Sequence, residues 1–599
     1  MRFFFIKNTR IQNGITRFLN YLSNSILFLS ILNLILMVIW FGYNVSPVYQ
    51  SSVKFVFEVS ILVYCVHLLT EIYKGFKIRN TRRNLFYVLL LIPYILFFIP
   101  FFLPQTPSGD LFSSIIYSNV YEGLLCGISS IVFLSKTLIE KILKRMNPFL
   151  LMSTSFFFVI VAGTVLLLLP RSTQTDVSFV DTLFIVTSAV CVTGLSPLTI
   201  SEAFTQEGQT IIMLLIQIGG LGVMTITSFF GVFFIGSISL SNRFALNNIL
   251  STESIGSLFK MLLYVFGFTL LFELTGATFI WLSIHGTLGL KFSEELFFSL
   301  FHAVSAFCNA GFSTLPEGLT SSLLIHNYPF YWIISSLIIC GGIGFPILAN
   351  LTQTLYIYVF KMKFNRRNLR IHKRYNILSL NSRIVLIFTS LLLTGGAFLF
   401  AMGEWDNPVL NLSAFGKITH SFFLSASART AGFNSFDLAQ LSLSSVLLLL
   451  FLMWIGGGAQ STAGGIKVNV FAVAIYTLIS VMKGKRRVEI GRHEISGDSI
   501  LRVLTTIILS LFLLGCATFL ILLLEEDKPF VSVLFECMSA MTTTGLSLNL
   551  TGSLGDPSKT ILILLMFIGR VGLLTFFMGF ARQIKTDKYN YPVDNILIN

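Results

Sequence analysis

Four short apolar stretches, each followed by a glycine, constrain the fold of this 599-residue chain more than any other feature. About 13 residues of helix rise only about 20 Å, whereas the hydrocarbon core of a bilayer is about 30 Å thick. Each stretch therefore has to enter and leave the membrane on one side, as a re-entrant half-helix. Irregular backbone at its tip is tolerated only where it is buried in protein or lines a water-filled cavity. The stretches are 178–191, 296–308, 415–428 and 530–542.

The glycines after these stretches lie 117, 121 and 113 residues apart, which indicates four copies of one unit. A glycine at each tip permits unusual backbone angles and lets carbonyl groups point at an axis. Rings of carbonyls replace the hydration shell of K⁺ in potassium filters, and the negative C-terminal ends of half-helices favour a cation. The predicted K⁺-binding residues are Val192, Thr193, Gly194, Asn309, Ala310, Gly311, Thr430, Ala431, Gly432, Thr543, Thr544 and Gly545.

The composition agrees with a polytopic helical membrane protein. The chain is 54% hydrophobic and only 11% charged, where soluble domains carry about 25% charged residues. Apolar runs long enough to span a membrane recur along it, and a spanning β-barrel would instead show roughly ten-residue alternating segments. No HExxH motif, nucleophile motif or paired intramembrane aspartate is present, so we do not expect an enzyme. The seven cysteines lack CxxC spacing, and neither a zinc site nor a disulfide framework is expected.

The net charge of +14 is concentrated in short loops, which argues for membrane topology rather than nucleic-acid binding. Basic residues cluster at 74–83, 361–374 and 483–492, whereas the loops 44–52 and 104–112 carry none. By the positive-inside rule the N-terminus and the basic loops are cytoplasmic, in the cell inner membrane. The four half-helices then lie on the outer side.

The predicted organisation is an extension followed by four pore units. Residues 1–147 hold about four transmembrane helices, near 23–43, 53–73, 85–103 and 113–139, and lack the glycine motif. The pore units are 148–240, 241–360, 361–482 and 483–599, the last with a C-terminal tail. Each has a first span, a half-helix, the motif and a second span. The second spans are expected at 210–235, 329–359, 443–480 and 558–581.

We expect the second span of the third unit to be interrupted, and we expect no other full span to be interrupted. Residues 443–480 would extend about 57 Å as one helix, and the small-residue run 456–465 has little helix propensity. A glycine- and alanine-rich helix-packing face is the alternative. Lys467 either positions this run or snorkels toward the cytoplasmic surface.

Arg570 falls within the last predicted span, where an arginine costs about 2.5–3.5 kcal/mol on insertion scales. It is expected to face a cavity or to form a structural pair, for instance with Glu536. The acidic residues at or near half-helix starts, Glu536 among them, are read mainly as caps. We expect Arg429 to tie the third loop to neighbouring protein, and Glu273 has no assigned role.

The stretches TSAVCVTGLSPL, HAVSAFCNAGFSTL, SASARTAGFNSF and CMSAMTTTGLSLNL resemble the four pore loops of the Trk/Ktr/HKT superfamily. Residues 148–582 resemble its bacterial potassium-translocating subunits, TrkH and KtrB. The resemblance implies an all-α fold, four M1–P–M2 units with pseudo-fourfold symmetry around one pore, and a preference for K⁺ from four filter glycines. It also implies an intramembrane gating loop, with Arg570 in the pore below the filter as an electrostatic barrier. The gating residues are Gly456, Gly457, Gly458, Ala459, Gln460, Ser461, Thr462, Ala463, Gly464, Gly465, Lys467 and Arg570.

The expected function is a potassium uptake pore, with K⁺ as the transported ion and no prosthetic group; a Na⁺- or H⁺-coupled symporter is the alternative. Coupled transport would predict inverted repeats and broken helices around a midplane site. The resemblance implies a homodimer above a cytoplasmic ring of nucleotide-binding RCK subunits, TrkA or KtrA, with membrane lipids around it. The basic loops 361–374 and 483–492 serve either as docking surfaces or as topology determinants. Four N-terminal helices depart from the family, because TrkH usually has two and KtrB none.

Overall fold

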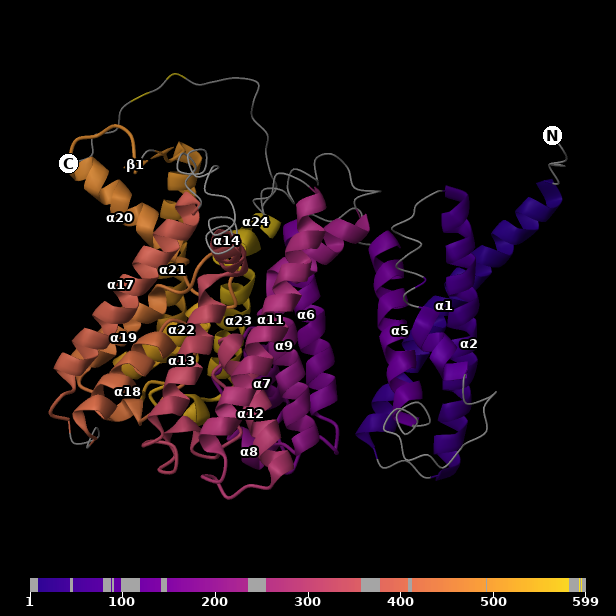
Figure 1. Cartoon of the computed structure of the whole chain (residues 1–599), viewed down its shortest axis with the longest axis horizontal. Coiled ribbons are helices and arrows are strands. Elements are labelled where there is room, and N and C mark those ends of the chain that lie inside the picture. Colours follow the sequence, from indigo (N-terminus) through magenta and orange to yellow (C-terminus); the bar gives the residue numbers. More distant parts are fainter. Residues whose placement is uncertain are drawn as a thin grey trace. The chain divides into compact units, whose positions relative to one another are not determined.

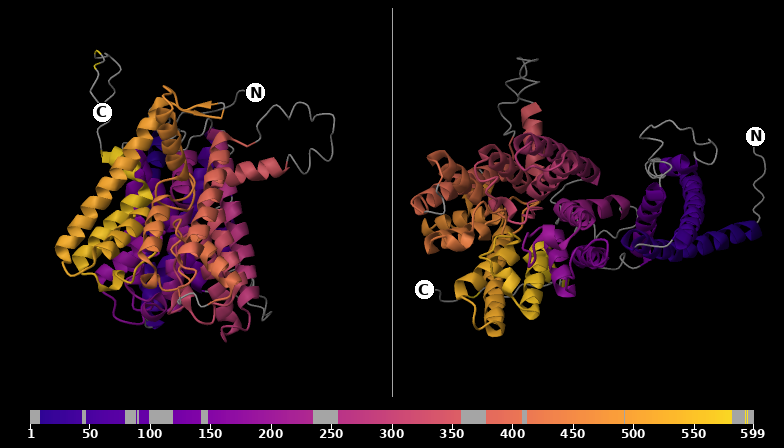
Figure 2. Two further views of the ribbon diagram at one scale, coloured as in Figure 1. Left: turned by 90° about the vertical axis from the view of Figure 1, so that its left-hand side faces the viewer. Right: turned by 90° about the horizontal axis from the view of Figure 1, so that it is seen from below.

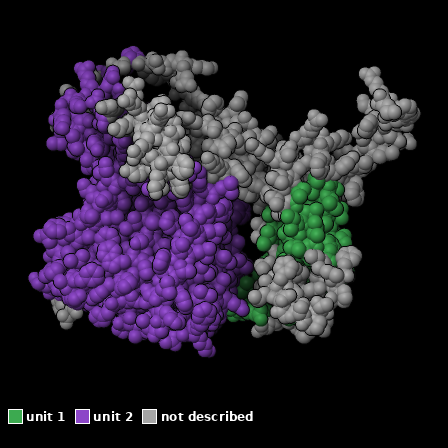
Figure 3. All heavy atoms as spheres, viewed as in Figure 1, with its two compact units in different colours: residues 1–146, 169–171 green, residues 147–168, 172–599 purple. Residues whose placement is uncertain are grey.

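The computed structural model describes residues 9–43, 47–78, 88, 91–98, 119–141, 148–234, 255–356, 378–407, 412–491, 493–580, 592 and 594. They form two compact units, residues 1–146 with 169–171 and residues 147–168 with 172–599 (Figure 3). The predicted boundaries at 240 and 360 and the basic loop 361–374 lie outside the described residues.

The N-terminal unit contains three long helices that pack against one another, α1 (Thr9–Gly42), α2 (Pro47–Ile78) and α5 (Asn119–Lys141). They coincide with three of the four predicted spans, and of the span 85–103 only 88 and 91–98 are described. A buried polar cluster joins the three helices, since the Tyr64 hydroxyl lies 3.0 Å from Ser30 Oγ and 2.9 Å from Ser130 Oγ. Asn33 donates to the same hydroxyl over 3.1 Å. Interhelical hydrogen bonds of this kind hold helices together in lipid, where apolar surface alone gives no drive to associate.

The second unit carries four successive groups of helices that surround a common centre in chain order (Figures 1 and 2). Each group has a long helix, a short one and a broken one. The long helices are α6 (Pro148–Leu167), α11 (Ile255–Ile284), α17 (Leu380–Gly403) and α21 (Gly497–Leu524). The short helices are α7 (Phe179–Val190), α12 (Phe292–Phe307), α18 (Ala414–Ser427) and α22 (Phe530–Thr542). The broken ones are α9 (Gln206–Phe234), α13 (Tyr328–Ile343) with α14 (Phe345–Tyr356), α19 (Leu443–Trp454) with α20 (Val468–Met482), and α23 (Asp556–Val571) with α24 (Leu573–Phe580).

Neighbouring groups touch through these helices, and the last group returns to the first. Helix α9 packs on α11, α13 on α18, α19 on α22, and α23 on α7. Short connecting elements complete the unit: α8 (Ile200–Ala203), the 3₁₀ turns η2 (Gly318–Thr320), η6 (Leu438–Gln440) and η7 (Thr551–Ser553), and the hairpin β1 (Glu489–Ile490) with β2 (His493–Glu494). The hairpin is a small departure from the all-α expectation; Ile490 on it is buried against α17 and α20.

The described helices fit a multi-pass membrane protein. Four of them contain stretches long and apolar enough to cross a bilayer, Tyr49–Thr70, Leu263–Ile284, Leu380–Gly403 and Gly497–Leu524, and two bent helix pairs add to these. Large apolar side chains such as Leu270 and Leu274 are exposed on α11. Their exposure is expected where the surrounding solvent is lipid.

The prediction that only one second span is interrupted is wrong, because all four are broken. Helix α9 leaves helical geometry at Gly222, the pair α13 and α14 bends by 100° at Gly344, and α23 and α24 bend by 94° at Gly572. Their φ angles are 52°, 106° and 95°, which glycine adopts without the steric cost of a side chain. The sequence contains a signal for these breaks, since the glycine-rich pentapeptides 218–222, 340–344, 455–459 and 568–572 occur once in each group.

Candidate functional site: four motif loops and the segment beneath them

The four glycine motifs, which we call motif loops 1 to 4 (192–195, 309–312, 430–433 and 543–546), lie against one another in a closed cycle. A side-chain Cβ placed on each glycine would collide with the main-chain carbonyl oxygen of the next loop. The glycine-to-carbonyl pairs, in chain order, are Gly194 with Ala310, Gly311 with Ala431, Gly432 with Thr544 and Gly545 with Thr193. Each carbonyl belongs to the residue directly before the next glycine, so the same register is kept around the cycle.

The backbone of the loops explains why glycine occupies these positions. The four glycines have φ angles of 96°, 72°, 78° and 94°, in the region that L side chains rarely adopt. Two residues earlier in each loop, Val192, Asn309, Thr430 and Thr543 also have positive φ, between 49° and 71°. Three of these four are β-branched, for which such angles cost about 1–3 kcal/mol and persist mainly at functional sites.

Serines from the half-helices hold the loops in this geometry. The Ser188 hydroxyl accepts from the Gly194 amide over 3.0 Å, and the Ser539 hydroxyl accepts from the Gly545 amide over 2.9 Å. In loop 2 the Ser305 hydroxyl instead donates to the Phe312 carbonyl over 2.9 Å, and Ser427 donates to the carbonyl after Gly432. These serines were not among the predicted site residues, although each precedes an alanine and lies five or six residues before its glycine.

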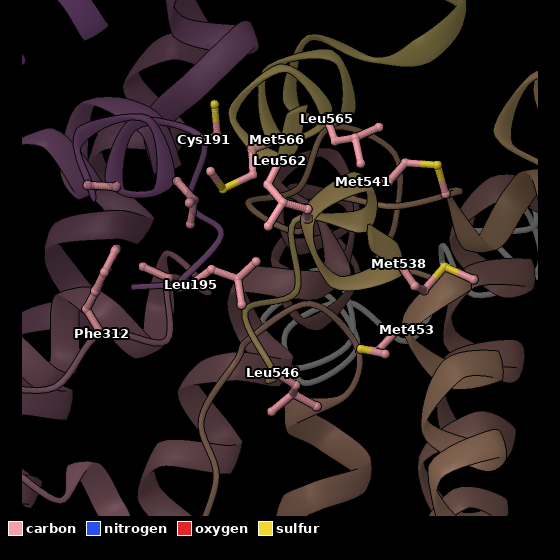
Figure 4. Close-up of a cluster of buried hydrophobic side chains, with 14 of the residues drawn as sticks. Cys191, Leu195, Phe312, Met453, Met538, Met541, Leu546, Leu562, Leu565 and Met566 are labelled. Carbon is pink, nitrogen blue, oxygen red and sulfur yellow. The ribbon is translucent and has the colours of Figure 1, made fainter. Parts of the chain in front are cut away.

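The residue after each glycine anchors its loop in apolar core. Leu195, Phe312, Phe433 and Leu546 are each at most 2% exposed. Figure 4 shows three of them, Leu195, Phe312 and Leu546, among the buried side chains around α22 and α23. Leucine or phenylalanine at this position therefore fixes the loop by burial, while the glycine before it stays free of a side chain.

The segment 456–465 lies directly beside the loops and the breaks of the second spans, and it is not helical. The Gly458 amide donates to the Gly342 carbonyl over 2.8 Å, and the Gln460 carbonyl accepts from the Phe345 amide over 3.3 Å. A Cβ on Gly344 would lie 2.7 Å from the Ala459 carbonyl oxygen, and Ser461 Oγ donates to Gly458 within the segment. The alternative of a helix-packing face is therefore wrong, since these residues form a bent loop between α19 and α20.

The same segment also contacts the ends of two half-helices, α12 and α22, and motif loop 3. Thr462 Oγ1 donates to the Phe307 carbonyl at the end of α12 over 3.2 Å. The Gly464 amide donates to Thr430 Oγ1 in loop 3 over 3.3 Å. A Cβ on Gly464 would lie 2.5 Å from the carbonyl oxygen of Thr542, which ends α22.

Three basic side chains hydrogen-bond the carbonyl groups of segment 456–465. Arg570, which is buried, donates to the Thr462 carbonyl and to the Gly219 carbonyl of α9. Lys467 donates to the Ala463 carbonyl over 2.5 Å, so the expectation that it positions the segment agrees with its contacts. Arg429 donates to the Gly456 carbonyl over 2.9 Å, and thus ties loop 3 to neighbouring protein as predicted.

Two expectations for Glu536 are wrong. It lies in the middle of α22, 1% exposed, rather than at a helix start, and its carboxylate accepts from Ser547 and from Thr551 Oγ1 instead of pairing with Arg570. Hydroxyls from the chain that follows loop 4 therefore satisfy this buried acid. Which hydroxyls reach Glu536 depends on the path of the chain after loop 4, and the spacing of residues in the sequence does not show that path.

Other acidic residues have clear partners. Asp181, in the first turn of α7, pairs with Lys559 of α23 at 2.6 Å and so joins the first helix group to the last. Glu294 accepts from the Lys291 amide as a helix cap over 3.2 Å. Glu273 of α11 is buried and accepts from Gln217 of α9 over 3.2 Å, and it also lies 3.8 Å from the thiol of Cys308, the residue that follows α12.

Comparison with known proteins places the chain in a family. Residues 125–591 match the family described as TrkH, cation transport protein. The chain belongs to the TrkH family. This family transports cations and is not a family of enzymes, as the sequence predicted. The match covers all four motif loops and the segment 456–465.

Relatives of known name cover most of the chain. It is 35% identical over 470 residues to the potassium/sodium uptake protein NtpJ of Enterococcus hirae, covering 77% of this chain and 99% of that protein. It is 35% identical over 459 residues to the Ktr system potassium uptake protein B of Bacillus subtilis, covering 76% of this chain and 97% of that protein. The fold is similar to the crystal structure of the potassium transporter TrkH from Vibrio parahaemolyticus. That match has a TM-score of 0.56 and 18% identity, and covers 82% of this chain and 95% of the other.

Proposed function

We propose that this chain is the pore subunit of a potassium uptake system and that K⁺ crosses the inner membrane through the cycle of motif loops. The observation that carries the proposal is the register in which each motif glycine faces the carbonyl of the next loop. Four carbonyl-rich loops held by one chain offer the coordination that replaces the water around K⁺. Relatives named for potassium uptake support the choice of ion.

The proposed filter consists of the glycine of each motif loop and the two residues before it. K⁺ is the transported ion and not a resident cofactor. The half-helices α7, α12, α18 and α22 each end at their motif loop, so the negative end of each helix dipole faces the proposed ion path. The serines that bond the loops keep the carbonyl groups in place without themselves coordinating the ion. Glycine is required because any side chain would fill the contact with the next loop.

The proposed gate is segment 456–465 together with Arg570. The segment contacts the ends of α12 and α22 and loop 3, which supports a position on the ion path beneath the filter. Arg570 adds a buried positive charge that opposes a passing cation, and its bonds to Thr462 and Gly219 hold the segment against α9. Opening then requires these bonds to break and the segment to withdraw.

For regulation we propose a homodimer that docks onto a cytoplasmic, nucleotide-binding RCK-type subunit, with the N-terminus and the basic loops on the cytoplasmic side. The naming of a relative as one part of a Ktr system supports a separate regulatory component. Of the basic loop 483–492, residues 483–491 are described, and Lys485 and Arg487 are exposed there.

Rubidium uptake in a host that lacks its own potassium transport tests the proposal. Gly432→Ser is expected to reduce uptake or its preference over sodium, because the new side chain would meet the Thr544 carbonyl. Gly395→Ser on α17 is the matched control, since a Cβ there meets no described residue within 4 Å apart from the adjoining turns of its own helix. Equal uptake and equal selectivity in both variants would contradict the filter assignment.

One observation favours a second candidate, a Na⁺- or H⁺-coupled symporter. Broken helices are typical of coupled transporters, and all four second spans are broken here. Reconstitution separates the two functions, because a channel carries Rb⁺ into vesicles under a membrane potential alone. In a symporter, Rb⁺ uptake would require a Na⁺ or pH gradient, or the reversal potential of the current would shift when that gradient changes.

A further inference from the structure

Arg429 stands between the filter proposed above and the gate proposed above. It follows the last residues of α18 and directly precedes Thr430 of motif loop 3. Arg429 is buried, at 7% exposure, and its guanidinium donates to the Gly456 carbonyl over 2.9 Å. Among the described residues no carboxylate forms an ion pair with it, and its Nε has no hydrogen-bond partner. Within the part of the chain that the structure describes, the Gly456 carbonyl of the gate segment is thus the one hydrogen-bond acceptor of the Arg429 guanidinium.

A second contact reinforces this link from the adjacent residue. The Gly464 amide donates to Thr430 Oγ1 over 3.3 Å, and Gly464 also packs against the Thr542 carbonyl before loop 4. The gate segment is therefore bonded near both of its ends to two consecutive residues, Arg429 and Thr430. Only two residues, Thr430 and Ala431, separate Arg429 from the loop 3 glycine.

Withdrawal of the segment would leave Arg429 buried with no acceptor. An unpaired charged donor in a dry environment is far more costly than an exposed one, so Arg429 has to follow the segment or find another acceptor. Either movement displaces the backbone of loop 3, because the side chain and the loop share one short stretch of chain. The bond between Arg429 and Gly456, together with the bond between Thr430 and Gly464, thus ties the ion-binding loop to the gate.

We propose that Arg429 is a positioning residue that couples motif loop 3 to segment 456–465, so that occupancy of the filter and opening of the gate are one linked equilibrium. The proposal rests on the proposed function, in which loop 3 is part of the filter and the segment is the gate. Such linkage is reciprocal. If an ion bound in the filter favours one state of the gate, the filter must bind that ion more tightly when the gate is in that state.

Arg570 provides the comparison, because it holds the same segment from a different side. Its hydrogen bonds run to Thr462 and to Gly219 of α9, not to a motif loop. Both arginines should keep the segment in place. Of the two arginines, only Arg429 should transmit the state of motif loop 3 to the segment.

Single-channel recording of the full-length protein in lipid bilayers tests the coupling, with K⁺, Rb⁺ or Na⁺ as the permeant ion. In the wild type the open probability should depend on which ion occupies the filter. Arg570→Ala should raise the open-to-closed ratio by about tenfold, the worth of one charged hydrogen bond, and keep the ion dependence. Arg429→Met should raise the ratio similarly and reduce the ion dependence, which then rests on the bond between Thr430 and Gly464 alone, with Arg429→Lys intermediate.

Several results would overturn the coupling. An Arg429→Met channel that opens more often but keeps the wild-type ion dependence would make Arg429 a latch only. An unchanged open probability in Arg429→Met, or an ion-independent wild type, would equally remove the proposal. If Arg429→Met fails to fold, Arg429→Lys supports the coupling by losing part of the ion dependence and opposes it by keeping all of it. A wild type with no K⁺ conductance would refute the proposed function instead.

Discussion

The ion pair between Asp181 and Lys559 should stabilise the closure of the four helix groups. The pair joins α7 of the first group to α23 of the last over 2.6 Å, across 378 residues of chain. The side chains are 15% and 9% exposed, so the pair lies between the exposed and the buried limits. Exposed pairs contribute about 0–1 kcal/mol, and removing one partner of a fully buried pair costs about 3–5 kcal/mol. We therefore expect Asp181→Asn to lower the free energy of unfolding by about 2 kcal/mol.

The assay is denaturant unfolding of the detergent-solubilised protein, followed by circular dichroism. Asp181→Asn, Lys559→Met and the double variant form a thermodynamic cycle, in which the double variant should lose less than the sum of the two single losses. The matched control is Glu489→Gln, which breaks the exposed pair with Lys485 and should change stability by less than about 0.5 kcal/mol. Strict additivity of Asp181→Asn and Lys559→Met would refute the ring-closing role.

Three further predictions concern the loops and the spans. Ser539→Ala removes the acceptor of the Gly545 amide and should lower Rb⁺ over Na⁺ selectivity in flux assays, whereas Ser336→Ala on the exposed face of α13 should not. Gly311→Ala should lose most Rb⁺ uptake at normal expression, because its Cβ would lie 2.7 Å from the Ala431 carbonyl oxygen at a φ of 72°. Glu273→Gln keeps the size of the side chain and should preserve Rb⁺ flux driven by potential alone; a loss of proton- or sodium-driven flux only would favour the symporter.

The half-helices were predictable because a membrane limits what a short apolar stretch can do. The predicted 178–191 and 530–542 correspond to α7 (Phe179–Val190) and α22 (Phe530–Thr542). Length and the following glycine were sufficient for this. The interruption between α19 and α20 was predictable for the same reason, since a span of that length exceeds the bilayer.

The breaks at Gly222, Gly344 and Gly572 were not anticipated, because hydropathy continues without change through a glycine and carries no information on backbone angles. The repeated glycine-rich pentapeptide was the available signal. The partners of Glu536 and Arg570 depend on contacts between distant segments, and composition around either residue gives no indication of them.

The fourth pentapeptide, 568–572, differs from the other three in one respect. Arg570 stands where the corresponding positions hold Gly220, Gly342 and Gly457. A transport protein assembled from four identical chains would have to carry four guanidinium groups at this level or none, and four like charges at close range would repel one another strongly. Covalent fusion of the quarters removes that restriction, so evolution could adjust a single charge while the remaining positions stayed small enough to accommodate it.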